Sequence, residues 1–251
     1  MKDINITNHI IAEFYKDIQD RVTSDVIIIG AGPSGLVASY LLAQDNFKVT
    51  VFEKRNQPGG GIWGGGMMFN QLVLPDDLQD FLNQMSIKFK LHPDNLISVD
   101  SVHFSSALLY HATEVGVKIF NNIGVEDLLV VDDRVRGVVI NWNDVIKNKI
   151  PIDPLTFEAK AVVDSTGHPA DGVEKLARRG LVEISQEFPM NADKAEKFVV
   201  EATGQLYPGL YVSGMAATAA KGGPRMGPIF GGMIKSGIKI ANLIKQTWRS
   251  S

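Results

Sequence analysis

The sequence predicts an α/β fold built around a parallel sheet, with a smaller β-sheet inserted. Residues 25–29 form a nearly continuous apolar run, which is typical of a central parallel strand covered on both faces. A glycine turn, GAGPSG at 30–35, follows it and opens a segment whose apolar residues have helical spacing. The run at 48–54 then has the character of a second strand. The three segments together make a βαβ unit of the usual size.

The segment before this unit, from about residue 5 to 20, has apolar residues at helical spacing among acidic ones. We expect an amphipathic helix there that packs on the body of the protein or on a neighbouring subunit. Because the segment is acidic throughout and has no uninterrupted apolar core, it does not resemble a signal peptide. The apolar residues of the expected helix are Ile10, Ile11, Phe14, Tyr15 and Ile18.

The remaining segments alternate between helical and strand patterns. Residues 57–66 hold six glycines and cannot form regular structure. We find no linker or repeat, so residues 1–251 are expected to form a single dinucleotide-binding α/β domain with an inserted sheet and loop region over about 117–158. The expected elements are helices at PDDLQDFLNQM and SSALLYHATEVG, a strand at VKIF, two strands in VEDLLVVDDRVRGVVINW, a structured loop over 143–158, strands at AKAVVDSTGH and PGLYVSGM, and a closing helix from FGGMIKSGIKIANLIK.

The composition excludes several classes of function. A net charge of −3 gives no reason to expect nucleic acid or an anionic membrane as a partner. No apolar run of 18 residues exists, so no bilayer-spanning helix is expected. The chain has no cysteine, which excludes disulfides, thiolate metal sites and a cysteine nucleophile. The same absence favours a reducing, cytoplasmic setting.

The glycine turn carries the motif of a dinucleotide site. Gly30 permits the tight turn, Gly32 lets a pyrophosphate approach the backbone, and Gly35 allows close packing of helix on strand. The phosphates would lie on the amides of the helix that begins near Ser34. Glu53 ends the second strand, 23 residues after Gly30, where a carboxylate accepts hydrogen bonds from an adenosine ribose. The alternative is a structural glycine turn in an unrelated α/β fold.

Three further segments, EKRNQPGG, STG and GLYVSG, resemble the glutathione-reductase type of FAD/NAD-binding, Rossmann-like fold. In those flavoproteins the last strand delivers an aspartate after its glycine, and that aspartate holds the flavin. Here Met215 follows Gly214. This departure argues against a conventional flavin site, although it leaves the fold prediction unchanged.

Five motifs in register, GAGPSG, GGGIWGGGM, IDPLT, STGH and GGPRMGPIFGGM, resemble the Thi4 thiamine thiazole synthases, close to the archaeal and bacterial members, from about residue 10 to 246. The resemblance implies a transferase that uses NAD as a substrate, without hydride transfer. The ADP-ribose part of NAD condenses with glycine, and sulfur is added to give the adenylated carboxythiazole used for thiamine. It also implies a homo-octamer with sites shared between subunits.

The resemblance assigns roles to three residues. Asp153 and His168 would bind Fe(II), and their oxygen and nitrogen donors suit this metal. Taken alone, Asp153 could equally cap a turn and His168 could form a hydrogen bond that stabilises a loop. Arg225 would grip the carboxylate of glycine through its bidentate guanidinium, the alternative being an ordinary surface arginine.

The family pattern also maps contacts with NAD or its products onto this chain. The residues concerned, besides Gly30, Gly32 and Gly35, are Ser34, Glu53, Lys54, Gly61, Val125, Pro151, Ile152 and Met215.

Pro151 also decides the sulfur source. In the eukaryotic branch a cysteine two residues before the metal-binding aspartate gives up its sulfur, and the enzyme is spent after one turnover. Pro151 has no sulfur, and the chain has no other cysteine. We therefore expect external sulfide as the donor and multiple turnovers.

Three other functions compete with this interpretation. An isomerase acting on ribose 1,5-bisphosphate needs cationic clamps for its phosphates. A flavin-dependent oxidoreductase of the same fold would be yellow when purified. An NAD-binding module without activity leaves the combination of Asp153, His168 and Arg225 unexplained.

Overall fold

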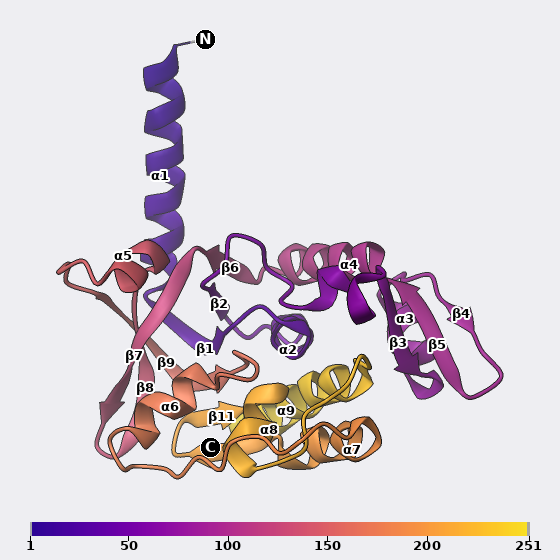
Figure 1. The fold of residues 1–251 in the computed structure, drawn as a ribbon. Helices are drawn as coiled ribbons and strands as arrows, with labels where there is room; N and C mark the ends of the chain where they lie inside the picture. Colours follow the sequence, from indigo (N-terminus) through magenta and orange to yellow (C-terminus); the bar gives the residue numbers. More distant parts are fainter. Residues whose placement is uncertain (1, 250–251) are drawn as a thin grey trace.

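The computed structural model describes residues 2–249 and confirms the expected α/β fold with a parallel sheet (Figure 1). Five strands run parallel in the order β11, β9, β1, β2, β6, and β10 lies antiparallel along the outer edge of β11. The strands are β1 (Thr23–Ile29), β2 (Val49–Glu53), β6 (Lys118–Asn121), β9 (Leu155–Asp164), β10 (Gly204–Tyr207) and β11 (Leu210–Val212).

Both faces of the central strand β1 are buried, as its apolar run predicts. Val26 and Ile28 pack into a core that includes side chains of α2 (Pro33–Gln44), α4 (Ser101–Glu114) and α9 (Gly231–Arg249). Ile27 and Ile29 point to the opposite face and pack into a second core beneath β7 (Ile123–Val131) and β8 (Arg134–Trp142). Because successive side chains of β1 point to opposite faces of the sheet, they are divided between two cores.

β7 and β8 form an antiparallel hairpin that is continuous with the main sheet. β8 pairs with the first four residues of β9, and the rest of β9 pairs with β1 and β11. Residues 143–158 differ from the expected loop, because α5 (Asn143–Asn148) forms there and β9 begins at Leu155. A helix of six residues is too short to show periodicity in the sequence.

A small antiparallel sheet, β3–β5–β4, lies beside α4 and was not predicted. Its strands are β3 (Gln71–Pro75), β4 (Lys90–Leu91) and β5 (Leu96–Asp100). The remaining elements are the short turns η1 (Ile62–Gly64), η2 (Gly66–Met68) and η3 (Asp76–Leu78), and the helices α3 (Gln79–Gln84), α6 (Asp171–Ala177), α7 (Ala192–Ala202) and α8 (Met215–Lys221).

The N-terminal helix α1 (Asp3–Arg21) forms as expected but projects away from the body (Figure 1). The body covers only its last turns, where Phe14 meets Phe120 edge to face and Arg21 donates to the carbonyl of Val49 at 3.1 Å. Further out, Ile10 is 65% exposed. The single chain therefore leaves most of the apolar stripe of α1 without a partner.

Within residues 2–249, no helix has the combination of length and apolar character needed to cross a membrane.

The contact between Gly35 and the first glycine turn gives a test of the fold. A Cβ at Gly35 would lie 2.3 Å from the carbonyl oxygen of Gly30, so we expect Gly35→Ala to lower the free energy of unfolding by about 1–3 kcal/mol. The matched control is Gly204→Ala, where the nearest atom to a new Cβ is 4.0 Å away. Urea unfolding of the ligand-free proteins measures both. Equal midpoints for Gly35→Ala and the wild type would contradict the tight packing.

Candidate functional site at the carboxyl edge of the sheet

The glycine turn lies at the carboxyl edge of the parallel strands, where ligands bind in this class of sheet. Gly30 has a φ of +94°, and its amide donates to the carbonyl of Phe52 at 2.8 Å. A Cβ at Gly30 would lie 2.8 Å from the carbonyl oxygen of Ser165, so only glycine fits. A Cβ at Gly32, by contrast, would meet only that oxygen, at 3.9 Å. The side-chain face of Gly32 is therefore open, as the close approach of a pyrophosphate to the backbone would require.

Glu53 holds this turn in place. Its Oε2 accepts from the amide of Ala31 and its Oε1 from the amide of Arg55, both at 2.8 Å, and the residue is only 6% exposed. A carboxylate oxygen can accept two hydrogen bonds, so each keeps capacity for a ribose hydroxyl. Lys54 forms an ion pair of 2.6 Å with Asp171 at the start of α6.

The glycine-rich segment 57–66 folds back over the first turn. The amide of Gly59 donates to the carbonyl of Ala31 at 2.7 Å, and Gly60 approaches so closely that a Cβ there would lie 3.1 Å from the Cα of Gly32. Gly61 comes next, and a Cβ added to it would meet no atom of residues 2–249 within 4 Å. The structure therefore brings Gly61 beside the first glycine turn, with open space on its side-chain face.

Buried hydroxyl groups join the ends of β9 and β11 to the start of α2. The Oγ of Ser213 lies 2.7 Å from that of Ser165 and 3.2 Å from that of Ser34. Gly214 packs against Ser34, since a Cβ there would lie 2.5 Å from its Oγ. Met215 follows as the first, buried residue of α8. Ser34 and Met215 therefore share the edge on which the glycine turn lies.

Asp164 organises the turn that carries His168, and sequence reasoning missed it. It is completely buried at the end of β9. Its Oδ1 accepts from the amide and hydroxyl of Thr166, and its Oδ2 accepts from the amides of Gly172 and Val173 at 2.8 and 2.9 Å. Burial raises the pKa of Asp164, whereas these donors act in the opposite direction. The signal in the sequence was an aspartate that ends an apolar strand immediately before a glycine turn.

His168 meets a carboxylate that the sequence did not reveal. Both oxygens of Glu187 lie 2.8 Å from its Nδ1. Glu187 and Arg225 line one surface hollow of about 710 Å³. Phe188 joins their segments, because its amide donates to the carbonyl of Gly223 and its carbonyl accepts from the amide of Arg225. The structure thus brings His168 and Arg225 to the same region.

The guanidinium of Arg225 is exposed and has no hydrogen-bond or ion-pair partner among residues 2–249. It borders the hollow with all of its donors available.

Asp153 lies elsewhere, before the first residue of β9, whereas His168 follows the last one. A strand of ten residues spans about 30 Å, so β9 places these two residues beyond its opposite ends. Among the described residues, no group of three or more histidines and carboxylates could hold a metal ion.

Three further residues of the family pattern lie near the start of the β7–β8 hairpin. They are Val125, Pro151 and Ile152. The carbonyl of Ile152 accepts from the side-chain amide of Asn141 at 3.1 Å, and Val125 of β7 pairs with Ile140 of β8. The amide of Asn122 donates to the carbonyl of Arg55 just before β7 begins. Val125 therefore lies toward the end of β2, while Pro151 and Ile152 stay with Asp153 on the exposed segment before β9.

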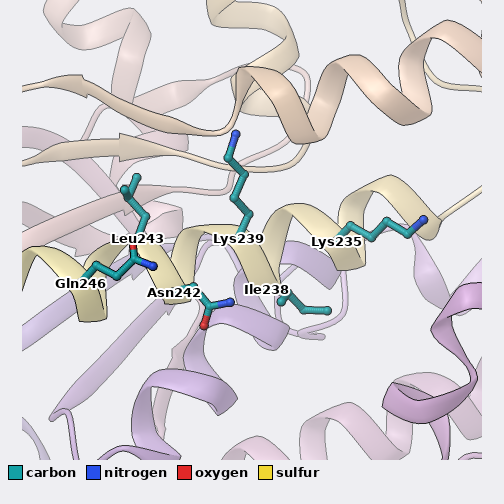
Figure 2. Close-up of a pocket in the computed structure, with 6 residues that line it drawn as sticks. All are labelled: Lys235, Ile238, Lys239, Asn242, Leu243 and Gln246. Atoms are coloured by element: carbon teal, nitrogen blue, oxygen red, sulfur yellow. The ribbon is translucent and has the colours of Figure 1, made fainter.

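A second hollow, of about 430 Å³, follows one face of α9 (Figure 2). Its two lysines already have partners, because Lys235 pairs with Asp77 at 2.6 Å and Lys239 donates to the carbonyl of Val200 at 2.7 Å. Burial lowers the pKa of Lys239. None of the residues indicated by the sequence motifs lines this hollow, which is formed by a single helix.

Comparison with known proteins matches this chain to one family. The model of the Thi4 family matches residues 7–230. The thiamine thiazole synthase of Thermotoga maritima is 53% identical over 249 residues, 99% of each chain. That of Pyrococcus furiosus is 47% identical over 247 residues, 98% of each chain. The crystal structure of THI4 from Thermovibrio ammonificans superposes with a TM-score of 0.95 at 37% identity, covering 99% of each chain.

A more distant structure shares the fold alone. OxyS anhydrotetracycline hydroxylase from Streptomyces rimosus has a TM-score of 0.50 at 18% identity, covering 66% of this chain and 35% of its own.

The network around Asp164 predicts how firmly the His168 turn is held. In Asp164→Asn, an NH₂ group replaces one carboxylate oxygen and cannot accept the hydrogen bonds that this oxygen received, such as those from the amides of Gly172 and Val173. Each buried donor left without an acceptor lowers the stability of the protein by about 1–3 kcal/mol. We expect lower stability and faster amide exchange over residues 165–173, measured by hydrogen–deuterium exchange mass spectrometry. Glu174→Gln is the control, because its pair with Arg178 lies on the surface. Unchanged exchange in Asp164→Asn would show that the turn does not depend on this carboxylate.

Proposed function

Because this chain belongs to the Thi4 family, whose matched members are thiamine thiazole synthases, we propose that it makes an adenylated carboxythiazole from NAD, glycine and external sulfide with Fe(II). The observation that supports the proposal is the arrangement, toward one edge of the sheet, of a glycine turn held by Glu53, a histidine held by a carboxylate and an arginine without a partner among residues 2–249. A synthase that joins the ribose part of NAD to an amino acid needs these groups side by side.

NAD binds as a substrate in this proposal. The space above Gly32 and the amino terminus of α2 receive the pyrophosphate, and Glu53 receives the adenosine ribose. Met215 occupies the position where flavoproteins of this fold place an aspartate, which argues against a resident flavin.

Glycine binds in the hollow beside Arg225. A guanidinium binds a carboxylate through two parallel hydrogen bonds, and this one has no competing partner among the described residues. Gly227 and Pro228 line the same hollow.

The donor set fits Fe(II) when two subunits supply it. Asp153 offers carboxylate oxygens with no partner among residues 2–249, and His168 offers Nε2, because Glu187 occupies Nδ1. When bound, the ion would serve as a template and Lewis acid for sulfide delivery. Since β9 separates the two side chains within one chain, Asp153 of one subunit must meet His168 of another. The uncovered apolar stripe of α1 supports the homo-oligomer, an octamer by family resemblance, that this arrangement requires.

The sulfur comes from outside the chain. Pro151 stands where the eukaryotic branch has its donor cysteine, and the chain contains no other cysteine. The enzyme is therefore not consumed by the reaction.

The direct test is an anaerobic incubation with NAD, glycine, Fe(II) and sulfide, followed by mass spectrometry. We expect more than one equivalent of adenylated thiazole per chain, and none when sulfide is left out. Processing of NAD without thiazole formation would refute external sulfide as the donor. Untouched NAD would refute the proposed reaction as a whole.

A mixing experiment tests the sharing of the metal site. Asp153→Ala and His168→Ala are each expected to be inactive, since each removes one metal ligand from every site. When the two variants are co-expressed, random assembly leaves about one site in four with both native groups, so about a quarter of the wild-type activity should return. A mixture that stays as inactive as its parents would exclude a site shared in this way.

A further inference from the structure

We propose that Glu187 is a positioning residue that fixes the tautomer of His168, so that Nε2 is the nitrogen available to the metal ion. The inference rests on the proposed metal-binding role of His168 and extends it to a residue that no motif in the sequence indicated. The proposed site then consists of two side chains, His168 and Glu187, which lie 19 residues apart in the sequence.

The geometry of the pair is specific. Both carboxylate oxygens of Glu187 lie 2.8 Å from Nδ1 of His168, and the side chain of Glu187 is only 14% exposed. The structure gives Glu187 no other hydrogen-bond or ion-pair partner among residues 2–249. The side chain of His168 is 45% exposed, so its ring has an open side.

Glu187 is itself held in place by the backbone. The next residue, Phe188, forms a parallel bridge with Pro224, and two hydrogen bonds join it to Gly223 and Arg225. The His168 turn is held independently by Asp164 through Thr166. The two partners therefore come from separately supported segments, which is the condition for one to orient the other.

The chemistry of the contact follows from its atoms. An ionised carboxylate only accepts hydrogen bonds, so a neutral imidazole facing it must carry its proton on Nδ1. The lone pair then lies on Nε2, which has no partner among the described residues. Carboxylates that orient metal-binding histidines in this way raise ligand basicity, and their removal typically costs about 10–100-fold in metal affinity.

The competing explanation is a surface contact that only ties the His168 turn to the segment around Phe188. Such a contact would contribute to stability, but it would not determine which ring nitrogen carries the proton. The tautomer and the metal affinity therefore distinguish the two explanations.

The experiment uses the full-length protein with Co(II) as a spectroscopic probe, added under anaerobic conditions. We expect Glu187→Ala to weaken Co(II) binding by about 10–100-fold. Glu187→Gln keeps an amide oxygen that accepts from Nδ1 and should retain more of the affinity. Glu174→Ala removes a different carboxylate that pairs with a basic side chain, so it serves as the control and should bind as the wild type does. Long-range ¹H–¹⁵N spectra of the metal-free proteins, assigned with His168→Gln, should show the proton of His168 on Nδ1 in the wild type and on Nε2 in Glu187→Ala.

The outcomes distinguish the positioning role of Glu187 from the metal-binding role of His168. If His168→Ala abolishes Co(II) binding while Glu187→Ala keeps both the affinity and the tautomer of the wild type, the positioning role is wrong and the metal site stands. If His168→Ala binds Co(II) as the wild type does, the metal role of His168 is wrong, and the role of Glu187 fails with it.

Discussion

The close approach of backbones at the first glycine turn is the constraint on which the rest of the site depends. Gly30 lies against the carbonyl of Ser165, and Gly35 lies against the carbonyl of Gly30. These contacts fix β1, β9 and the start of α2 relative to one another. Because the strands are parallel, their carboxyl ends then deliver Glu53 and the turn of His168 to the same edge. Any side chain at Gly30 or Gly35 would push these elements apart.

The length of β9 also determines how far apart Asp153 and His168 lie. Its first residues pair with β8 and its last residues pair with β1 and β11, so one strand belongs to both the hairpin and the parallel core. The segments before and after it carry Asp153 and His168 and are held apart by the strand itself. In the proposed metal site, these two side chains would therefore have to come from two subunits. The exposed apolar stripe of α1 is consistent with a chain that buries more surface as an oligomer.

The sequence predicted the parts of this structure that depend on local patterns. The strand–turn–helix unit and Glu53 follow from spacing alone, and both are present where expected. Asp164 and Glu187 were missed because their roles depend on partners supplied by loops, which no periodicity reveals. The small sheet was missed for a related reason, since β4 has two residues and β3 is bounded by a proline. For α1 the pattern predicted the helix correctly, but an apolar stripe does not specify what covers it.

The hydrogen-bond partners distinguish residues that hold the structure together from residues whose side chains are available to a ligand. Asp164, Ser165 and Ser213 are buried and bonded to other groups of the chain, so their polar atoms are used in holding the turns. Asp153 and Arg225 are exposed and have no side-chain partner among residues 2–249. His168 belongs to both groups, with Nδ1 bound to Glu187 and Nε2 open. A buried polar group without a partner lowers the stability of the protein, whereas an exposed one forms hydrogen bonds with water until a ligand binds. In the proposed reaction, Asp153 and Arg225 would therefore bind metal and substrate without first breaking a side-chain contact among the described residues.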